Sequence, residues 1–259
     1  MAFALITGAS GGIGLSIAHE LAKRKIDLLL VARSEDKLSA AKKTLEETYP
    51  IRVELLSLDL SMPSSSESVL DWITQNHFAV NILVNNAGYG IWGCVDETPL
   101  AQLSNMMQLN MITLAELCHT MLPELKKHPQ SYVLNVASTA AYQAVPTLAT
   151  YAASKSFVVL FTRGLRRELQ NSPVSVTCLS PGATSTNFID RAGMGSLKDR
   201  AEKFSMRPEA VARIAVNGMF NGNAEVIPGF MNWISVQLTY LLPKNLIEGV
   251  AARLYKTKA

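Results

Sequence analysis

The stretch Ala2-Phe-Ala-Leu-Ile-Thr-Gly-Ala-Ser-Gly-Gly-Ile-Gly14 decides the fold, because it joins an apolar run to a glycine-rich turn. Apolar residues then recur at helical spacing, so the order is strand, turn and helix. Glycines at such a junction let the backbone approach a pyrophosphate, and the N–H groups that open the helix can bind its charge. Gly8, Gly12 and Gly14 suit that role; the alternative is that they serve only close packing.

The rest of the chain alternates between short apolar runs and longer periodic segments. We expect strands at residues 2–7, 27–32, 52–58, 82–85, 132–137, 174–179 and 225–227. Runs such as residues 28–31 are continuously apolar, which is typical of parallel strands covered on both faces. The pattern predicts one α/β domain over residues 1–259. Its fold is a doubly wound, Rossmann-like parallel sheet of seven strands with helices on both faces, and ligands bind at the strand carboxyl ends.

A second run, Tyr151-Ala-Ala-Ser-Lys155, lies thirteen residues after Ser138. Residues four apart share a helix face, so a helix over residues 150–170 would place the Lys155 ammonium one turn from the Tyr151 phenol. A nearby positive charge lowers the pKa of a phenol, which would make Tyr151 a usable general acid and base. For the isolated pair, an ordinary amphipathic helix is the simpler interpretation.

With both features the chain resembles the short-chain dehydrogenase/reductase family over residues 1 to about 190. Thr7 to Gly14 matches the family's TGxxxGxG motif, Asn85-Asn-Ala-Gly88 its NNAG motif, and Pro181-Gly182 its PG motif. The resemblance implies that Tyr151 donates the proton, Lys155 holds the nicotinamide ribose and lowers the Tyr151 pKa, Ser138 orients the carbonyl, and Asn110 supports a water relay.

The same resemblance implies a set of dinucleotide-binding residues. Asp59 would bind the adenine amino group, residues 86–88 would line the adenosine side, and Thr184 and Thr186 would face the carboxamide and pyrophosphate. The full expected set is Gly8, Ser10, Gly12, Ile13, Gly14, Arg33, Asp59, Leu60, Asn86, Ala87, Gly88, Tyr151, Lys155, Pro181, Gly182, Thr184 and Thr186.

The end of the second strand bears on the choice of cofactor, since an NAD enzyme places a carboxylate there for the ribose hydroxyls. The sequence reads Val31-Ala-Arg-Ser34, so it lacks that carboxylate. The guanidinium of Arg33 suits a 2′-phosphate, and Ser10 could donate as well. NADP(H) is therefore favoured over NAD(H). Alternatively, Arg33 is a solvated loop residue and Asp36 contacts the ribose.

These features predict an oxidoreductase that transfers hydride between NADP(H) and a carbonyl compound or secondary alcohol. Residues 183–207 are expected to form a substrate lid with apolar faces, which favours an apolar or acyl-type substrate. The alternative class is a dinucleotide-binding sensor or structural protein without turnover. Intact Tyr151 and Lys155 argue for the enzyme.

Residues 228–259 are expected to form a helical tail that closes the pocket or packs on a partner subunit. The uncharged stretch 230–242 is too short to cross a bilayer. Contact with a membrane surface is the less favoured interpretation. The family resemblance further implies a homodimer or homotetramer packed through helices near residues 100–125 and 150–170.

Composition argues against other functions. The chain has 259 residues, 48% of them hydrophobic, and a formal charge of +3 from dispersed basic residues, without the basic stripe that nucleic-acid binding requires. The scattered histidines indicate no metal site, and Ser138 lies outside a Gly-x-Ser-x-Gly elbow, so hydrolysis is disfavoured. The N-terminus lacks a signal-peptide pattern, which predicts a cytoplasmic protein. The three widely spaced cysteines are expected to be buried and unpaired.

Overall fold

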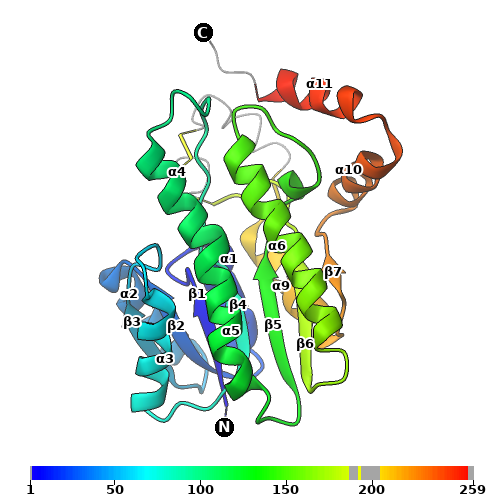
Figure 1. The fold of residues 1–259 in the computed structure, drawn as a ribbon. Coiled ribbons are helices and arrows are strands. Elements are labelled where there is room, and N and C mark those ends of the chain that lie inside the picture. The colour runs from blue at the N-terminus through cyan, green and yellow to red at the C-terminus, as the bar shows by residue number, and fades with distance from the viewer. Residues whose placement is uncertain (1, 187–191, 194–204, 256–259) are drawn as a thin grey trace.

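A computed structural model of the chain describes residues 2–186, 192–193 and 205–255 (Figure 1). Within those residues the strands form one seven-stranded parallel sheet in the order β3-β2-β1-β4-β5-β6-β7. The strands are β1 (Phe3–Thr7), β2 (Asp27–Ala32), β3 (Val53–Ser57), β4 (Val80–Asn85), β5 (Ser131–Val136), β6 (Val174–Leu179) and β7 (Glu225–Val226). The order reverses between β1 and β4, and a doubly wound sheet opens its ligand crevice at such a point.

Helices connect the strands and cover both faces of the sheet. They are α1 (Gly12–Ala22), α2 (Glu35–Thr48), α3 (Ser65–Gln75), α4 (Leu100–Met107), α5 (Leu114–Leu125), α6 (Ala149–Glu168), α9 (Pro208–Phe220), α10 (Phe230–Leu241) and α11 (Lys244–Leu254). A π-helical turn, η1 (Gln108–Thr113), joins α4 to α5, and a 3-10 turn, η2 (Thr139–Tyr142), follows β5. The predicted fold class and the expected strands are confirmed, with shifts of up to two residues at strand ends.

Two cores form because successive residues of each strand point to opposite faces. From β1, Phe3 and Leu5 enter the core beneath α3, α5 and α6, while Ala4 and Ile6 enter the core beneath α1, α2 and α9. Figure 1 shows these layers in front of and behind the sheet. β1 and β2 are therefore apolar at consecutive positions.

The carboxyl ends of the strands carry the remaining elements. In Figure 1 the arrows point upward, and α4, α10 and α11 lie at that upper end. A Cβ built on Gly182 would lie 2.5 Å from the Asn232 side chain, so α10 packs directly on the loop after β6. No helix in the described parts of the chain is long and apolar enough to cross a membrane.

The predicted lid, residues 183–207, lies largely outside the described residues. Its two described ends are hydrogen bonded to each other: Met206 N donates to Ala183 O at 3.0 Å, and Ser185 N donates to Met206 O at 3.0 Å. The two described ends of the segment therefore lie side by side, beside the carboxyl end of β6.

Candidate active site

The glycine-rich turn after β1 is held by tight packing at two of its four glycines, Gly8 and Gly14. Gly8 has φ +66°, and a Cβ there would lie 2.8 Å from Asn86 Nδ2. A Cβ on Gly14 would lie 2.5 Å from both Asn86 Nδ2 and Gly8 O. The Asn86 amide itself donates to Thr7 O at 2.9 Å and Gly8 O at 3.2 Å. Gly8 and Gly14 thus have a packing role, and Asn86 fixes the shape of the turn.

The start of α1, unlike Gly8 and Gly14, has free space beside its backbone at Gly11. No side chain caps this helix through a hydrogen bond, and a Cβ on Gly11 would meet nothing within 4 Å. Gly12 has φ +57°, and a Cβ built there would lie 3.1 Å from Thr186 Cγ2. Uncapped N–H groups and an open approach fit a phosphate group. The residues present therefore fit a dinucleotide phosphate at the start of α1 near Gly11, with the Thr186 side chain beside Gly12.

Ser138, Tyr151 and Lys155 converge beside the end of β5. Ser138 caps η2, accepting from Ala140 N at 3.1 Å, and shares a hydrogen bond with the Tyr151 phenol. Tyr151 and Lys155 are one turn apart on α6, and both are buried. Lys155 Nζ donates to Val136 O at 2.8 Å, which anchors the ammonium to the last residue of β5.

The expected effect of Lys155 on Tyr151 is wrong for this structure. Burial raises the pKa of Tyr151 to about 12, against a smaller lowering by the Ser138 hydrogen bond, and Lys155 is not among the causes. Burial also lowers the pKa of Lys155 to about 8. Helical spacing places the pair on one face but does not fix where the flexible lysine side chain points, and here it points to a backbone carbonyl.

Asn110 lies in the π-helical turn η1, a feature often found at functional sites. Its amide donates to Tyr89 O at 2.9 Å and Ser154 Oγ at 3.0 Å, and its Oδ1 accepts from Tyr89 N at 3.2 Å. A Cβ on Gly88 would lie 2.9 Å from Asn110 Oδ1 and 3.3 Å from Lys155 Nζ. Gly88 therefore lets Asn110 and Lys155 lie against the same backbone, so all four predicted catalytic residues meet.

Arg33 and Asp59 lie at the opposite side of the crevice, after β2 and β3. Their side chains form an ion pair at 3.7 Å and are 59% and 40% exposed. Burial raises the pKa of Asp59, but hydrogen bonds from Ser61 and the nearby Arg33 outweigh it and lower the pKa overall. An exposed pair of this kind is weak, so the guanidinium stays accessible to a ligand.

The remaining predicted cofactor residues line the same rim, with one restriction. Leu60 is buried in the core, and its carbonyl accepts from Thr113 and Ser65, so only its backbone could meet a ligand. Pro181 O accepts from Thr139 N, and Thr184 Oγ1 donates to Gly182 O. Ser10 and Ala87 lie partly exposed in the turns after β1 and β4, and Ile13 lies partly exposed in the first turn of α1.

Comparison with known proteins agrees with this arrangement. The sequence model of the family described as short chain dehydrogenase matches residues 2–195. The chain belongs to the short-chain dehydrogenase family. It is therefore an oxidoreductase that interconverts a carbonyl group and an alcohol, on a fold that binds a nicotinamide dinucleotide.

Individual relatives of this short-chain dehydrogenase are distant. It is 26% identical to very-long-chain 3-oxoacyl-CoA reductase-A of Danio rerio, over 99% of this chain and 79% of that protein. It is 30% identical to hydroxysteroid dehydrogenase-like protein 1 of Gallus gallus, over 72% of this chain and 57% of that protein. A solved short-chain dehydrogenase from Sphingobium yanoikuyae in complex with NADPH superposes with a TM-score of 0.82 at 26% identity, covering 100% of this chain and 98% of that one.

The sequence did not single out the apolar wall beside Tyr151. Buried residues from four segments pack with the phenol: Leu103, Met106, Val145, Leu148, Ala152 and Ala192. Tyr255, just past α11, packs against this cluster, and its carbonyl accepts from Trp92 Nε1 at 3.3 Å and Thr147 Oγ1 at 3.0 Å. Tyr255 also acts on the Tyr151 pKa, raising it, so the two phenols are near neighbours. Sequence spacing carries no signal for a contact across a hundred residues.

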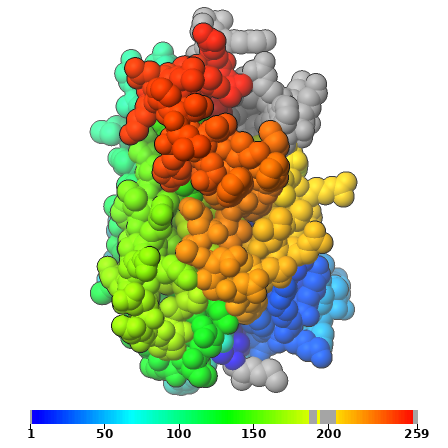
Figure 2. Space-filling view, turned by 90° about the vertical axis from the view of Figure 1, so that its right-hand side faces the viewer, coloured from blue at the N-terminus to red at the C-terminus, as the bar shows by residue number. Residues whose placement is uncertain are grey.

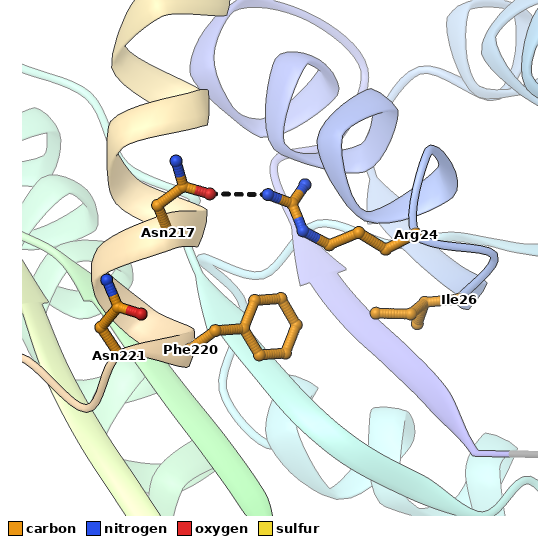
Figure 3. A pocket seen from close by; sticks show the side chains of 5 residues that line it. All are labelled: Arg24, Ile26, Asn217, Phe220 and Asn221. Carbon is orange, nitrogen blue, oxygen red and sulfur yellow. Dashed lines mark hydrogen bonds between the residues drawn. The ribbon is translucent and has the colours of Figure 1, made fainter.

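A separate pocket of about 450 Å³ lies at the other end of this short-chain dehydrogenase, where the strands begin. Figure 3 shows Arg24 and Ile26, beyond α1, facing the last turn of α9. Arg24 donates to Asn217 Oδ1 at 2.7 Å and lies over the Phe220 ring. Its polar groups satisfy one another, and in the described residues no cluster of His, Cys, Asp or Glu could hold a metal.

The cysteines fit the expectation in part. Cys118 and Cys178 are buried, and burial raises the pKa of each to about 12, which leaves them as unreactive thiols. Cys94 is only half-buried, because it lies in the loop before α4 and not in a strand or helix of the core.

Proposed function

We propose that the protein is an NADPH-dependent reductase of apolar ketones, with 3-oxoacyl thioesters as the leading substrate class. The observation that carries this proposal is the buried Tyr151 phenol, hydrogen bonded to Ser138 and flanked by an apolar wall. In the proposal Asn110, Ser138, Tyr151 and Lys155 are the catalytic residues.

The chemistry assigned to the chain is proton transfer and charge stabilisation. A bound NADPH supplies the hydride. The Ser138 hydroxyl donates a hydrogen bond to the substrate oxygen, and Tyr151 gives its phenolic proton to the same oxygen as negative charge develops there. Burial raises the pKa of Tyr151 to about 12, so the phenol is protonated at neutral pH and can donate a proton. Asn110 holds the end of the crevice through Tyr89 and Ser154.

Arg33 supports the preference for NADPH. Its accessible guanidinium follows β2, where an NAD enzyme would have a carboxylate, and a planar fork suits a 2′-phosphate. The expected partner residues for the rest of the cofactor lie along the crevice from Gly12 through Asp59 to Thr186. NADH use is the competing outcome, and the choice is tested by comparing the two cofactors directly.

The substrate class is supported by the wall beside Tyr151 and by a relative. The wall is built from Leu, Met, Val and Ala side chains with the ring of Tyr255. These side chains offer no charged group to a substrate, so an alkyl chain would bind there with favourable burial. The Danio rerio relative is named as a 3-oxoacyl-CoA reductase, which fits a ketone next to an acyl chain.

Oligomerisation through α5 and α6 belongs to the same proposal. Ile112 on η1 and Phe157 and Leu160 on α6 are large apolar side chains left exposed on this layer. A symmetric dimer buries the same patch of both copies. Light scattering at several concentrations tests this, and a monomeric mass throughout would reject it.

The decisive experiment follows oxidation of NADPH and of NADH with a panel of short ketones, bulky ketones and 3-oxoacyl thioesters. Tyr151→Phe is compared with Tyr132→Phe, since Tyr132 is a partly buried β5 residue whose ring packs on Phe220. We expect NADPH turnover that falls by about a thousandfold in Tyr151→Phe and stays near wild type in Tyr132→Phe. Equal turnover in Tyr151→Phe would reject the assignment. Tight NADPH binding without turnover on any ketone would favour a dinucleotide-binding sensor.

A further inference from the structure

Helices α10 and α11 and the turn between them carry most of the exposed large hydrophobic side chains among the described residues. The described part of the chain has seventeen exposed large hydrophobic side chains, and ten of them lie between residues 230 and 254. We call this set the apolar cap; its members are Phe230, Met231, Trp233, Leu238, Tyr240, Leu241, Leu242, Leu246, Val250 and Leu254. Figure 2 shows the two helices, in orange and red, at one end of the molecule. A large exposed apolar patch indicates a binding surface.

The apolar cap lies on the solvent-exposed faces of α10 and α11, while the opposite faces of these helices pack on the domain. On α10, Val236 is buried and Asn232 packs on Gly182, one turn apart. On α11, Ala251 is buried. The exposed Leu246, Val250 and Leu254 are spaced by four residues and form one stripe on α11. Each helix therefore has an apolar outer face in addition to the contacts that hold it to the domain.

The charge of this region distinguishes it from the rest of the chain. Residues 228–259 contain four basic residues (Lys244, Arg253, Lys256 and Lys258) and one acidic residue, Glu248, while residues 1–227 contain twenty of each kind. The net charge of +3 therefore belongs to this segment. Between Phe230 and Leu242 there is no charged residue at all.

We infer that the apolar cap binds an anionic lipid surface, with α10 and α11 lying in the interface. Helices with Trp, Phe and Leu on one side and basic residues beside them insert their apolar side chains at the headgroup boundary and attract anionic lipids. Trp233 and Tyr240 are ring systems with a polar tip, which favour that depth. A second copy is a poorer occupant, because a two-fold interface would bring together two patches of the same net positive charge.

The position of the apolar cap links lipid contact to the proposed substrate. Leu254 ends the stripe on α11, and the next residue, Tyr255, packs beside Tyr151. An apolar substrate dissolved in a bilayer would then meet the enzyme near the apolar wall that holds Tyr151. Lipid binding itself does not depend on the proposed function, and its test uses neither substrate nor cofactor.

The test is flotation of the full chain with phosphatidylcholine vesicles, alone or with about 30 mol% phosphatidylglycerol. The variant Met231→Asp with Leu241→Asp places charge at side chains that are 73% and 78% exposed. The matched control is Met62→Asp, 56% exposed and following β3 at the opposite edge of the sheet. A second variant, Lys244→Ser with Arg253→Ser, removes basic charge and leaves the apolar side chains intact. Thermal unfolding shows that each variant is folded.

We expect the wild type and Met62→Asp to float with the anionic vesicles, and each double variant to bind at least about tenfold more weakly. A wild type that does not float, or an aspartate variant that floats equally well, would overturn the inference. If the wild type does not float and is a dimer, and the aspartate variant is a monomer, the apolar cap would be assigned to a second copy.

Discussion

The two ends of the sheet handle polar side chains in opposite ways. Where the strands begin, Arg24 is bonded to Glu20 and Asn217 and lies over Phe220, so a surface cation has a partner on each side. Where the strands end, Lys155 is buried with a single backbone acceptor, and burial lowers its pKa to about 8. The bonds of Arg24 stabilise the fold, while the buried Lys155 costs stability, and in our proposal it is retained for catalysis.

The largest effect that tests this comparison is expected for Lys155→Met. The variant should lose about a hundredfold or more in turnover, because the ammonium expected to hold the nicotinamide ribose is removed. It should also be more stable than the wild type, with a Tm about 3 °C higher or more. The lowering of the Lys155 pKa from 10.5 to about 8 corresponds to a loss on the order of 3 kcal/mol in the folding free energy of the wild type. The variant regains this energy but leaves the Val136 carbonyl without its donor, which costs about 1 kcal/mol.

The pH dependence provides the control for Lys155→Met. Because the Lys155 pKa is lowered by folding, the charged lysine destabilises the folded state fully at pH values below about 8. This destabilisation is lost as the pH rises toward 10.5, where the lysine of the unfolded chain also releases its proton. The difference in Tm between variant and wild type should therefore be widest at neutral pH and close toward pH 10.5. A variant that is less stable at neutral pH would show that Lys155 supports the fold as Arg24 does.

The next effect is expected at Arg33, a cation at the functional end that is accessible to a ligand. Arg33→Ala should raise the KM for NADPH by about ten- to a hundredfold, since a charge-assisted contact with phosphate is lost. The KM for NADH should change little. Steady-state kinetics with both cofactors measure the ratio, and an equal change for the two would place Arg33 outside the 2′-phosphate site.

A smaller effect is expected at Tyr255, which belongs to the functional end only through the tertiary fold. Tyr255→Ala should alter the ratio of kcat/KM between long and short 3-oxoacyl thioesters several-fold, because it opens the wall beside Tyr151. Tyr240→Ala is the matched control, since that ring contacts Tyr142 and not the wall. An unchanged ratio in Tyr255→Ala would remove this residue from the substrate side.

The smallest effect is expected at the end of the sheet where the strands begin. Arg24→Ala should lower Tm by about 2–4 °C through loss of its bonds to Glu20 and Asn217, and leave turnover with NADPH within about twofold of wild type. Calorimetry and the standard assay measure the two quantities. A large loss of turnover would mean that the two ends are coupled and the comparison is too simple.

The fold and most of the candidate site were predictable from local signals. Apolar runs alternate with periodic segments, and each motif follows a strand, so parallel topology brings Gly12, Ser138 and Gly182 to one edge. A tetrad spread from Asn110 to Lys155 assembles because strands and helices have fixed geometry. Backbone geometry does not fix the direction of a long side chain. The Lys155 side chain, for example, is hydrogen bonded to the Val136 carbonyl.

The sequence alone determined the family, the doubly wound sheet and the residues at its carboxyl edge, since these depend on spacings within a few turns or strands. Only the tertiary structure decided that Gly8 and Gly14 pack against Asn86, that Tyr255 lies beside Tyr151, and that α10 and α11 turn an apolar face outward. Those facts depend on contacts between segments up to a hundred residues apart. Burial then sets the pKa of Tyr151 and Lys155, because desolvation depends on every neighbour in space.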